Sequence, residues 1–367
     1  MKLEGVDILD GDGWRHGMDV EVAGQGHRAI RTGHPRDDAP VVCPAPIDLQ
    51  VNGGGGRMLG DCEAPGDVLG ILTAHRRLGT GAILPTLISD TPETTENVLH
   101  LVETARKADP GILGLHLEGP HLAVPGAHDP ERLRDLTAGD VARYIDAKHR
   151  LGHLMITLAP ERARPEQIAD LARAGIVVSL GHTACSCAEA EAAFAAGARM
   201  ATHLFNAMSG LHHREPGLVG AALTRAEAFG IIADGHHVAD AALKVAVAAR
   251  PEAAIPVSDA MAVAGTRKPG FELGGRAVLR QEGKLVLEDG TLAGADISLL
   301  QALRHIAGVT DRPLAEVMPM GFDRPHRLLT GVPNRLTEGA PARLIHIDGN
   351  EIEGFDGISW HVLREAS

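Results

Sequence analysis

The chain has 367 residues, 44% of them hydrophobic and 23% charged, an ordinary globular composition with room for a large domain and a smaller one. Its net charge of −13 argues against general nucleic-acid binding, and no apolar run reaches the roughly 20 residues that cross a bilayer, so no membrane partner is expected. The N-terminus has no signal-peptide pattern, and four cysteines make no disulfide framework in a chain this long. We therefore expect a cytoplasmic protein.

Both ends of the chain alternate apolar and polar residues over short stretches, as at residues 19–22 and 341–347. Such alternation predicts antiparallel strands. Neither end could bury a core alone. We therefore expect residues 1–42 and 335–367 to pair into one small β-sandwich domain, and residues 43–334 to form the main domain.

Between the two ends, eight short apolar runs alternate with helical patterns. Runs of this length read as buried parallel strands. The repeated alternation predicts an α/β fold, a (β/α)8 TIM-like barrel; an open doubly wound sheet is the alternative, although few open sheets use eight repeats. The predicted strands are 46–51, 82–88, 112–118, 153–158, 176–182, 199–203, 229–233 and 255–259. The predicted helices are 66–78, 91–108, 138–151, 165–174, 188–196 and 239–249.

After the eighth run the pattern changes. Residues 271–291 are expected to form a hairpin with its turn at 280–284, because the stretch alternates and has a polar, glycine-containing centre. A helical pattern over 295–306 follows it.

Four of the predicted strands end in groups that bind metals or move protons: Glu118, His182, His203 and Asp259. The carboxyl ends of barrel strands meet at one face, where barrel enzymes hold their active sites. Glu118, His182 and His203 offer one oxygen and two nitrogens, and three protein ligands with a fourth position left open are typical of a catalytic zinc site. Taken singly, each could be an isolated polar loop residue; their equivalent positions favour the metal site.

Asp259 can take a proton from an attacking water and give it to a leaving amine, as general base and then general acid. The alternative is that its carboxylate caps a following helix.

The chain resembles the N-acetylglucosamine-6-phosphate deacetylase branch of the amidohydrolase superfamily over the whole predicted barrel. Each matching segment is short, but together they occur in the family's order and with sensible spacing. They are residues 48–53 (DLQVNG), 114–120 (GLHLEGP), 181–183 (GHT), 202–208 (THLFNAM), 214–217 (REPG), 232–238 (IADGHHV), 258–261 (SDAM) and 292–294 (LAG).

This resemblance implies hydrolysis of the acetamide of N-acetyl-D-glucosamine 6-phosphate to glucosamine 6-phosphate and acetate. It makes Glu118, His182 and His203 the ligands of one divalent metal ion per subunit, with Zn²⁺ expected, and it makes Asp259 the acid/base. His128 matches the family histidine that binds near the acetyl group, where it would help to stabilise the oxyanion.

The resemblance also implies the substrate contacts and a homodimer. Asn206 and Ala207 match a phosphate-binding segment, and Arg214 matches a phosphate-binding arginine that can come from the neighbouring subunit. Arg214 could instead be a surface charge, and Asn206 a helix cap. His237 is the expected ligand and His236 incidental, because adjacent strand residues face opposite ways. The implied substrate contacts are Ala127, Asn206, Ala207, Arg214, His237, Leu292, Ala293 and Gly294.

The chain departs from many amidohydrolases at the end of the first strand, where Gln50 and Asn52 replace the His-x-His pair. Amides are poor Zn²⁺ ligands beside imidazole and carboxylate, so a single-metal site is expected. Cys185 and Cys187 follow His182 closely and are interpreted as small buried residues; a thiolate that joins the metal is the lesser alternative.

Two other functions stay open. One is a different amidohydrolase-type deacylase, acting on N-acetylgalactosamine 6-phosphate or on an N-acyl-D-amino acid; residues 206–208 and 214–217 favour a phosphosugar, but the sequence does not choose the epimer. The other is a non-catalytic metal-binding sensor. The intact set of metal ligands with Asp259 argues against it, because a sensor has no need of an acid/base.

Overall fold

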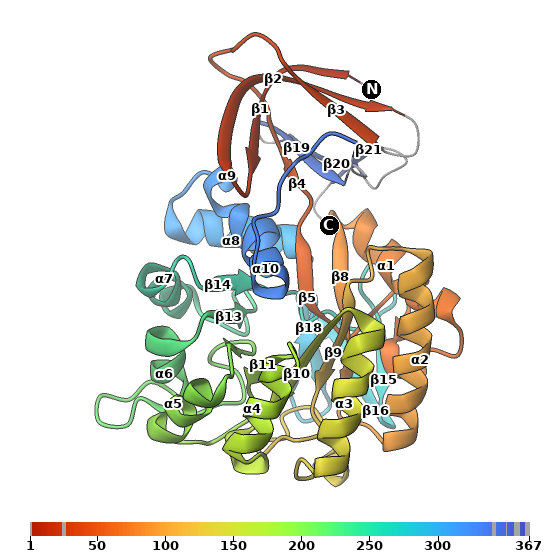
Figure 1. Cartoon of the computed structure of the whole chain (residues 1–367), viewed down its shortest axis with the longest axis vertical. Helices are drawn as coiled ribbons and strands as arrows, with labels where there is room; N and C mark the ends of the chain where they lie inside the picture. Colours follow the sequence, from red (N-terminus) through yellow and green to blue (C-terminus); the bar gives the residue numbers. More distant parts are fainter. Residues whose placement is uncertain (1, 24–26, 340–342, 350, 356–359, 364–367) are drawn as a thin grey trace.

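The computed structural model describes residues 2–23, 27–339, 343–349, 351–355 and 360–363. Figure 1 shows a barrel of strands surrounded by helices, with a small β-sheet above it. No helix in these described ranges combines the length and the apolar character needed to cross a membrane.

Eight parallel strands form the barrel sheet and follow one another in chain order, which confirms the predicted (β/α)8 architecture. Six of the eight strands are shorter than predicted, among them the two that lead to His203 and Asp259. The backbone leaves the extended region at His203 (φ 29°) and Asp259 (φ 49°), so the strands stop before these residues. The strands are β5 (Ile47–Val51), β8 (Ala82–Ile88), β9 (Gly114–Glu118), β10 (His153–Leu158), β11 (Val177–Leu180), β12 (Met200–Ala201), β13 (Ala228–Ile231) and β14 (Ala254–Pro256).

Hydrogen bonds between the segments at β5 and β14 close the barrel. The Asn52 N–H donates to the Ala260 carbonyl at 2.9 Å, and the Asp259 N–H donates to the Gln50 carbonyl at 3.0 Å. This closure excludes the open-sheet alternative. It also places the end of the first strand directly beside the segment that carries Asp259.

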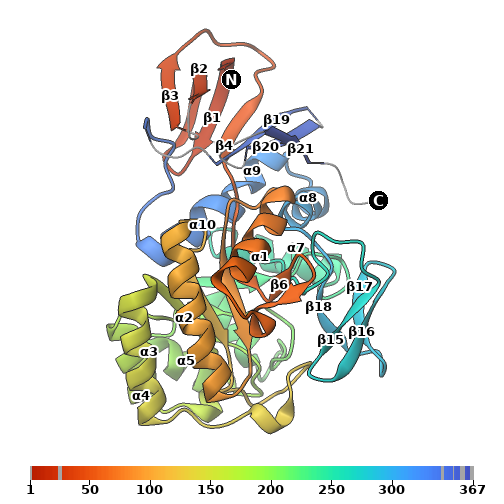
Figure 2. The same cartoon turned by 90° about the vertical axis from the view of Figure 1, so that its right-hand side faces the viewer.

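Helices cover the outside of the barrel (Figures 1 and 2). The six predicted helices are confirmed, and the pattern predicted at 295–306 lies four residues further along, in α8. Sequence reasoning missed α6, which has mainly small residues, and α10, whose internal Pro325 argues against a helix. The helices are α1 (Pro65–Arg77), α2 (Pro92–Ala108), α3 (Ala138–Leu151), α4 (Pro165–Arg173), α5 (Cys187–Ala196), α6 (Gly217–Arg225), α7 (Asp240–Ala249), α8 (Leu299–Thr310), α9 (Leu314–Val317) and α10 (Pro319–Thr330).

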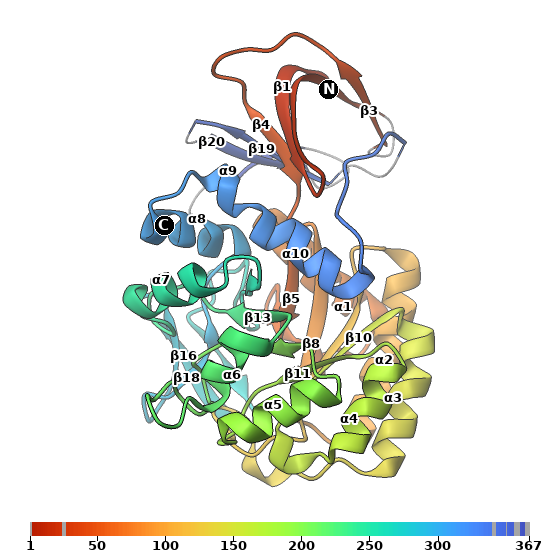
Figure 3. The ribbon, with the colours of Figure 1, turned by 60° about the vertical axis from the view of Figure 1, so that its left-hand side comes forward.

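The amino ends of the strands are packed with apolar side chains. Leu84 of β8, Met155 of β10 and Val177 of β11 belong to one buried cluster that also includes Leu328 of α10. Figure 3 shows α10 between the barrel and the small sheet. This end of the barrel is therefore closed by apolar contacts.

The small sheet joins the two ends of the chain, which confirms the predicted small β-domain. Its seven strands run in the order β21-β20-β19-β4-β1-β2-β3, with β4 antiparallel to β19 at the junction. The exact limits of the two domains stay a prediction. The strands are β1 (Lys2–Asp10), β2 (Gly13–Ala23), β3 (His27–Thr32), β4 (Val41–Pro44), β19 (Leu344–Asp348), β20 (Glu351–Phe355) and β21 (Trp360–Val362).

A four-stranded antiparallel sheet is inserted after β14 and lies beside the barrel (Figure 2). The predicted hairpin is its centre, where Gln281 pairs with Lys284, but two further strands flank it. Met261, in the loop after β14, packs in one cluster with Leu273 of the insert. The strands are β15 (Gly270–Leu273), β16 (Arg276–Gln281), β17 (Lys284–Leu287) and β18 (Leu292–Ala295), and a short hairpin of β6 (Gly53–Gly54) and β7 (Arg57–Met58) follows β5.

Candidate active site

The four predicted metal and proton-transfer residues meet at the carboxyl ends of the strands. Glu118 is the last residue of β9, and His182, His203 and Asp259 follow β11, β12 and β14 within three residues. The last three have φ of 49°, 29° and 49°, a region that residues with a Cβ seldom occupy. Strained backbone of this kind is concentrated at functional sites, where the surrounding structure holds it in place.

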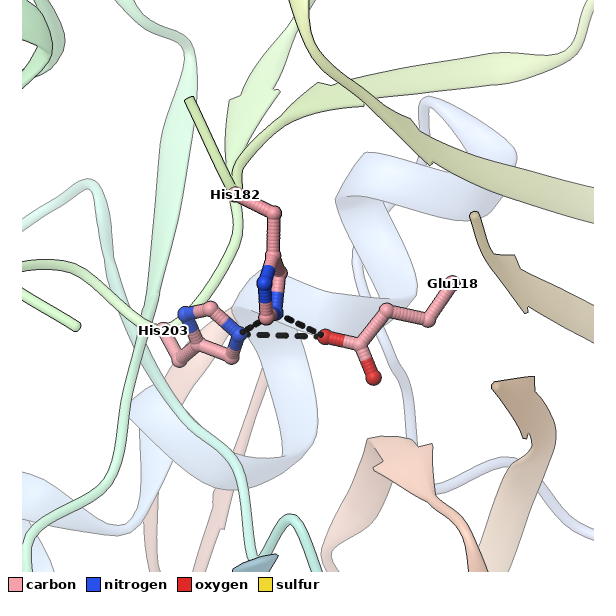
Figure 4. A group of neighbouring side chains, drawn as sticks. All are labelled: Glu118, His182 and His203. Atoms are coloured by element: carbon pink, nitrogen blue, oxygen red, sulfur yellow. Dashed lines mark hydrogen bonds and ion pairs between the residues drawn. The ribbon is translucent and has the colours of Figure 1, made fainter. Parts of the chain in front are cut away.

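Glu118, His182 and His203 point their ligand atoms at one another (Figure 4). The His203 Nε2 lies 3.0 Å from the His182 Nε2 and 3.0 Å from the Glu118 Oε1, and the His182 Nε2 lies 3.4 Å from that oxygen. Ligands of a tetrahedral Zn²⁺, with bonds of about 2.0–2.1 Å, are separated by about 3.3 Å. The three buried groups therefore fit a metal site in both chemistry and spacing.

Neighbouring groups hold two of these ligands in position. The His182 Nδ1 donates a hydrogen bond to the Val124 carbonyl at 2.8 Å, which leaves the Nε2 lone pair free for a metal. The Glu118 Oε1 also accepts from the Gln50 Nε2 at 3.0 Å. Burial raises the pKa of Glu118, but hydrogen bonds from His182 and His203 outweigh burial and hold that pKa well below its ordinary value.

Asp259 is buried beside this centre, and two amides bind it. Its Oδ1 accepts from the Gln50 Nε2 at 2.9 Å and from the Asn52 Nδ2 at 2.7 Å. Burial, and then the charge of Glu118, raise the pKa of Asp259 to about 6, as suits a carboxylate that exchanges protons near neutral pH. Sequence reasoning treated Gln50 and Asn52 only as missing histidines and did not assign this contact.

His128 lies beside two of these ligands, Glu118 and His182. Its Nε2 is 3.9 Å from the Glu118 Oε2, and its ring centroid is 4.6 Å from that of His182. Burial, and then the neighbouring His182, lower the pKa of His128 to about 3, so its imidazole is neutral at neutral pH.

A cavity of about 340 Å³ opens onto these groups. Side chains from the inserted sheet form part of its wall, including Leu273. The predicted site residues that line this cavity are Glu118, Ala127, His128, His182, His203, Asn206, Ala207, His237, Asp259, Leu292 and Gly294.

Two predicted substrate residues do not line the cavity. Ala293 is buried between two residues that do. Arg214 lies on an exposed loop, and no arginine or lysine is found among the described residues that line the cavity. A cation for a phosphate group would therefore have to come from outside the cavity wall of this chain.

His237 and His236 face different spaces, although they lie in a bend after β13 and not on a strand as the prediction assumed. His237 lines the cavity, and its Nδ1 bonds to the Asp234 Oδ2 at 2.7 Å, while His236 lines a separate polar cavity. Asp234 also accepts from the backbone N–H groups of both histidines. Asp234 thereby orients His237. Sequence reasoning did not assign this role, although Asp234 lies in the family-like segment 232–238.

The two cysteines near His182 do not reach the metal centre. Cys185 is buried, Cys187 is partly exposed, and neither is among the residues that line the cavity. Cys187 therefore differs from the expected buried residue, because it occupies the first turn of α5 at the surface.

No family model matches the chain. It is 37% identical to the N-acetylgalactosamine-6-phosphate deacetylase of Escherichia coli O157:H7, over 85% of this chain and 84% of that protein. It is 33% identical to the N-acetylglucosamine-6-phosphate deacetylase of Danio rerio, over 84% of this chain and 80% of that protein. The crystal structure of N-acetylglucosamine-6-phosphate deacetylase from Pasteurella multocida superposes with a TM-score of 0.89 at 26% identity, covering 99% of this chain and all of that one.

Proposed function

Because the chain belongs to the family of N-acetylglucosamine- and N-acetylgalactosamine-6-phosphate deacetylases, within the amidohydrolase superfamily, we propose that it deacetylates N-acetyl-D-glucosamine 6-phosphate. The products are glucosamine 6-phosphate and acetate. The observation that supports this most directly is the convergence of Glu118, His182 and His203 beside Asp259 in one cavity.

We propose one Zn²⁺ per subunit, held by Glu118, His182 and His203. Two imidazoles and a carboxylate suit Zn²⁺, and a bound divalent cation lowers the pKa of a water and polarises a carbonyl. Gln50 and Asn52 use their amides to bind Asp259 instead, which supports a single-metal centre.

In this proposal Asp259 moves the proton and His128 stabilises charge. Asp259 accepts a proton from the attacking water, whose oxygen bonds to the acetyl carbon. His128 donates a hydrogen bond to the carbonyl oxygen as negative charge develops there. The C–N bond then breaks, and Asp259 returns its proton to the leaving amine.

The rest of the cavity would bind the sugar phosphate. We propose that Asn206 and Ala207 contact the phosphate, and that His237, oriented by Asp234, contacts the sugar, with Ala127 and residues 292–294 beside it. Since Arg214 lies outside the cavity of its own chain, we propose that the protein is a homodimer in which Arg214 reaches the cavity of the neighbouring subunit. We also propose that the protein is cytoplasmic.

N-acetylgalactosamine 6-phosphate is a second candidate substrate. The relative that acts on this epimer by name is 37% identical to the chain, against 33% for the Danio rerio glucosamine enzyme. The two sugars differ in one hydroxyl orientation, so direct comparison of the two substrates must decide between them.

The test of the activity is metal analysis of the purified protein combined with acetate release from both N-acetylhexosamines, with and without the 6-phosphate. We expect about one metal ion per chain and turnover of at least one phosphorylated sugar. Absence of acetate release from every sugar by the metal-loaded protein would refute the proposed function.

The test of the phosphate site is Arg214→Ala. The matched control is Arg173→Ala, because the Arg173 side chain is exposed on the outer face of α4. We expect Arg214→Ala to raise KM for the phosphorylated sugar about tenfold or more and to leave KM for the unphosphorylated sugar unchanged. Arg173→Ala should change neither. An equal effect of Arg214→Ala on both sugars would contradict the assignment.

A further inference from the structure

Ser89 contacts the imidazole of His128 from the side away from the cavity. Ser89 directly follows β8, is buried, and is not among the residues that line the active-site cavity. Its backbone N–H donates to the His128 Nδ1 at 3.2 Å, and its Oγ lies 2.9 Å from the same nitrogen.

This contact determines which ring nitrogen of His128 carries the proton. A backbone N–H can only donate, so the nitrogen that faces it must offer a lone pair. In a neutral imidazole one nitrogen accepts and the other donates. The proton of neutral His128 is therefore on Nε2, and the hydroxyl of Ser89 is free to donate to Nδ1 as well.

The Nε2 of His128 faces the reaction centre. It lies 3.9 Å from the Glu118 Oε2, and His128 lines the cavity. The ring therefore presents a hydrogen-bond donor, not an acceptor, to any group bound beside the metal ligands.

Gly119 leaves the space that Ser89 needs. A Cβ at Gly119 would lie 2.3 Å from the Ser89 Oγ, much closer than side-chain atoms approach one another, and the φ of Gly119 is +93°. The residue after Glu118 thus makes room for the hydroxyl that contacts His128. Two adjacent residues at the end of β9 therefore serve the site: Glu118 is a candidate metal ligand, and Gly119 leaves space for the Ser89 side chain.

We propose that Ser89 is a positioning residue that holds His128 as its Nε2–H tautomer, so that His128 acts in the reaction only as a hydrogen-bond donor. Proton abstraction from the attacking water is then left to Asp259. The part of this inference that concerns catalysis rests on the proposed deacetylation, whereas the tautomer itself does not.

The tautomer can be observed directly by NMR of Zn²⁺-loaded protein labelled with ¹⁵N-histidine, without substrate. Long-range ¹H–¹⁵N correlations distinguish a protonated Nε2 from a protonated Nδ1, and His128 is assigned by its loss in His128→Gln. We expect a protonated Nε2 and an unprotonated Nδ1. A proton on Nδ1, in either a neutral ring or an imidazolium, would overturn the proposal even if the protein proves to be an active deacetylase.

The role of the hydroxyl is tested with Ser89→Ala and Ser89→Thr. Ser89→Ala keeps the backbone donor and removes the Oγ, so we expect kcat to fall about five- to tenfold with KM within about twofold, and a measurable Nδ1–H population of His128. Ser89→Thr restores a hydroxyl and should recover most of kcat and the wild-type spectrum.

Ser298→Ala is the matched control, because it removes the same atoms from a buried serine that caps α8 and does not line the cavity. It should lower thermal stability and leave kcat and the His128 signals unchanged. A Ser89→Ala protein with an unchanged His128 spectrum, or one no slower than Ser298→Ala, would overturn the role proposed for the Ser89 hydroxyl, because this variant keeps the backbone N–H that donates to Nδ1. If no variant and no wild-type sample releases acetate, the deacetylase assignment fails while the NMR result still decides the tautomer.

Discussion

The two ends of the barrel strands are built from opposite kinds of residue. At the amino ends, apolar side chains such as Leu84 and Met155 form a buried cluster, and each buried Å² of apolar surface contributes roughly 25 cal/mol to stability. At the carboxyl ends, Glu118, His203 and Asp259 are also buried, but burying ionisable groups and holding positive φ both cost free energy. One end of the barrel supplies stability, and the other uses part of it to hold reactive groups in place.

A layer of hydrogen-bonded polar side chains separates these two ends. The Thr202 Oγ1 lies 2.7 Å from the Thr157 Oγ1 and 2.6 Å from the Ser179 Oγ, and the His116 Nε2 lies 2.8 Å from the Thr157 Oγ1. Each of these buried groups has a partner, so the layer carries polar residues into the barrel without leaving them unsatisfied. If this division is correct, substitutions at the carboxyl ends should change turnover without lowering stability. Substitutions at the amino ends should lower stability without changing turnover.

Asp259→Asn should have the largest effect. The amide keeps the shape but cannot take a proton from water, so we expect kcat to fall about 10³-fold or more. Metal analysis should still find about one ion per chain, and the urea midpoint should not fall, because a buried charge has been removed. Near-normal turnover with metal bound would show that another group is the base.

Leu84→Ala tests the opposite end. Removing a fully buried leucine from the apolar cluster should lower the free energy of unfolding by about 2–5 kcal/mol, as measured by urea denaturation. The folded fraction should keep its metal content and its kcat within about twofold. Loss of metal from folded Leu84→Ala protein would mean that the two ends are coupled.

Asp48→Asn should make the free energy of unfolding less dependent on pH. Asp48 lies in β5, where the first strand meets the segment after β14. The Asp48 carboxylate accepts from the Ser258 N–H at 3.3 Å, and burial raises the pKa of Asp48 to about 7. Because the folded protein binds this proton more tightly than the unfolded chain, the stabilisation is complete below about pH 4 and is lost as pH rises towards 7.

The wild-type unfolding free energy should therefore fall by roughly 2–4 kcal/mol more than that of Asp48→Asn between about pH 4 and pH 8. Urea denaturation across this range measures the difference. Parallel pH profiles for the two proteins would show that Asp48 is ionised in the folded state.

Among these four substitutions, Gln50→Leu should have the smallest effect. Gln50 donates to both the Glu118 Oε1 and the Asp259 Oδ1, so its loss should misplace the base and lower kcat about tenfold. Bound metal should be unchanged, because Glu118 keeps its other contacts. An equal fall in activity and metal content would instead mean that Gln50 maintains the metal site.

The sequence alone predicted the barrel, the small β-domain from the two ends and the cluster of Glu118, His182 and His203. These predictions were within reach because strand–helix alternation is local, and because parallel strands bring their carboxyl ends to one face. The elements that were not predicted are those in which local sequence preference and tertiary packing disagree. Helix α10 was not predicted; its internal Pro325 disfavours a helix locally, and tertiary packing of its buried face outweighs that preference.

Only the tertiary structure decided the contacts that control the reactive groups. Gln50 reaches Asp259 across 209 positions of the chain, Ser89 reaches His128 across 39, and the exposed Arg214 lies outside the cavity that the phosphate hypothesis needs it to serve. Such contacts depend on how the barrel closes and on where each loop turns back, and neither is encoded in the spacing of a motif. The sequence therefore specified which chemical groups are present at the mouth of the barrel, while the closed fold determined which atom of each group faces its neighbour.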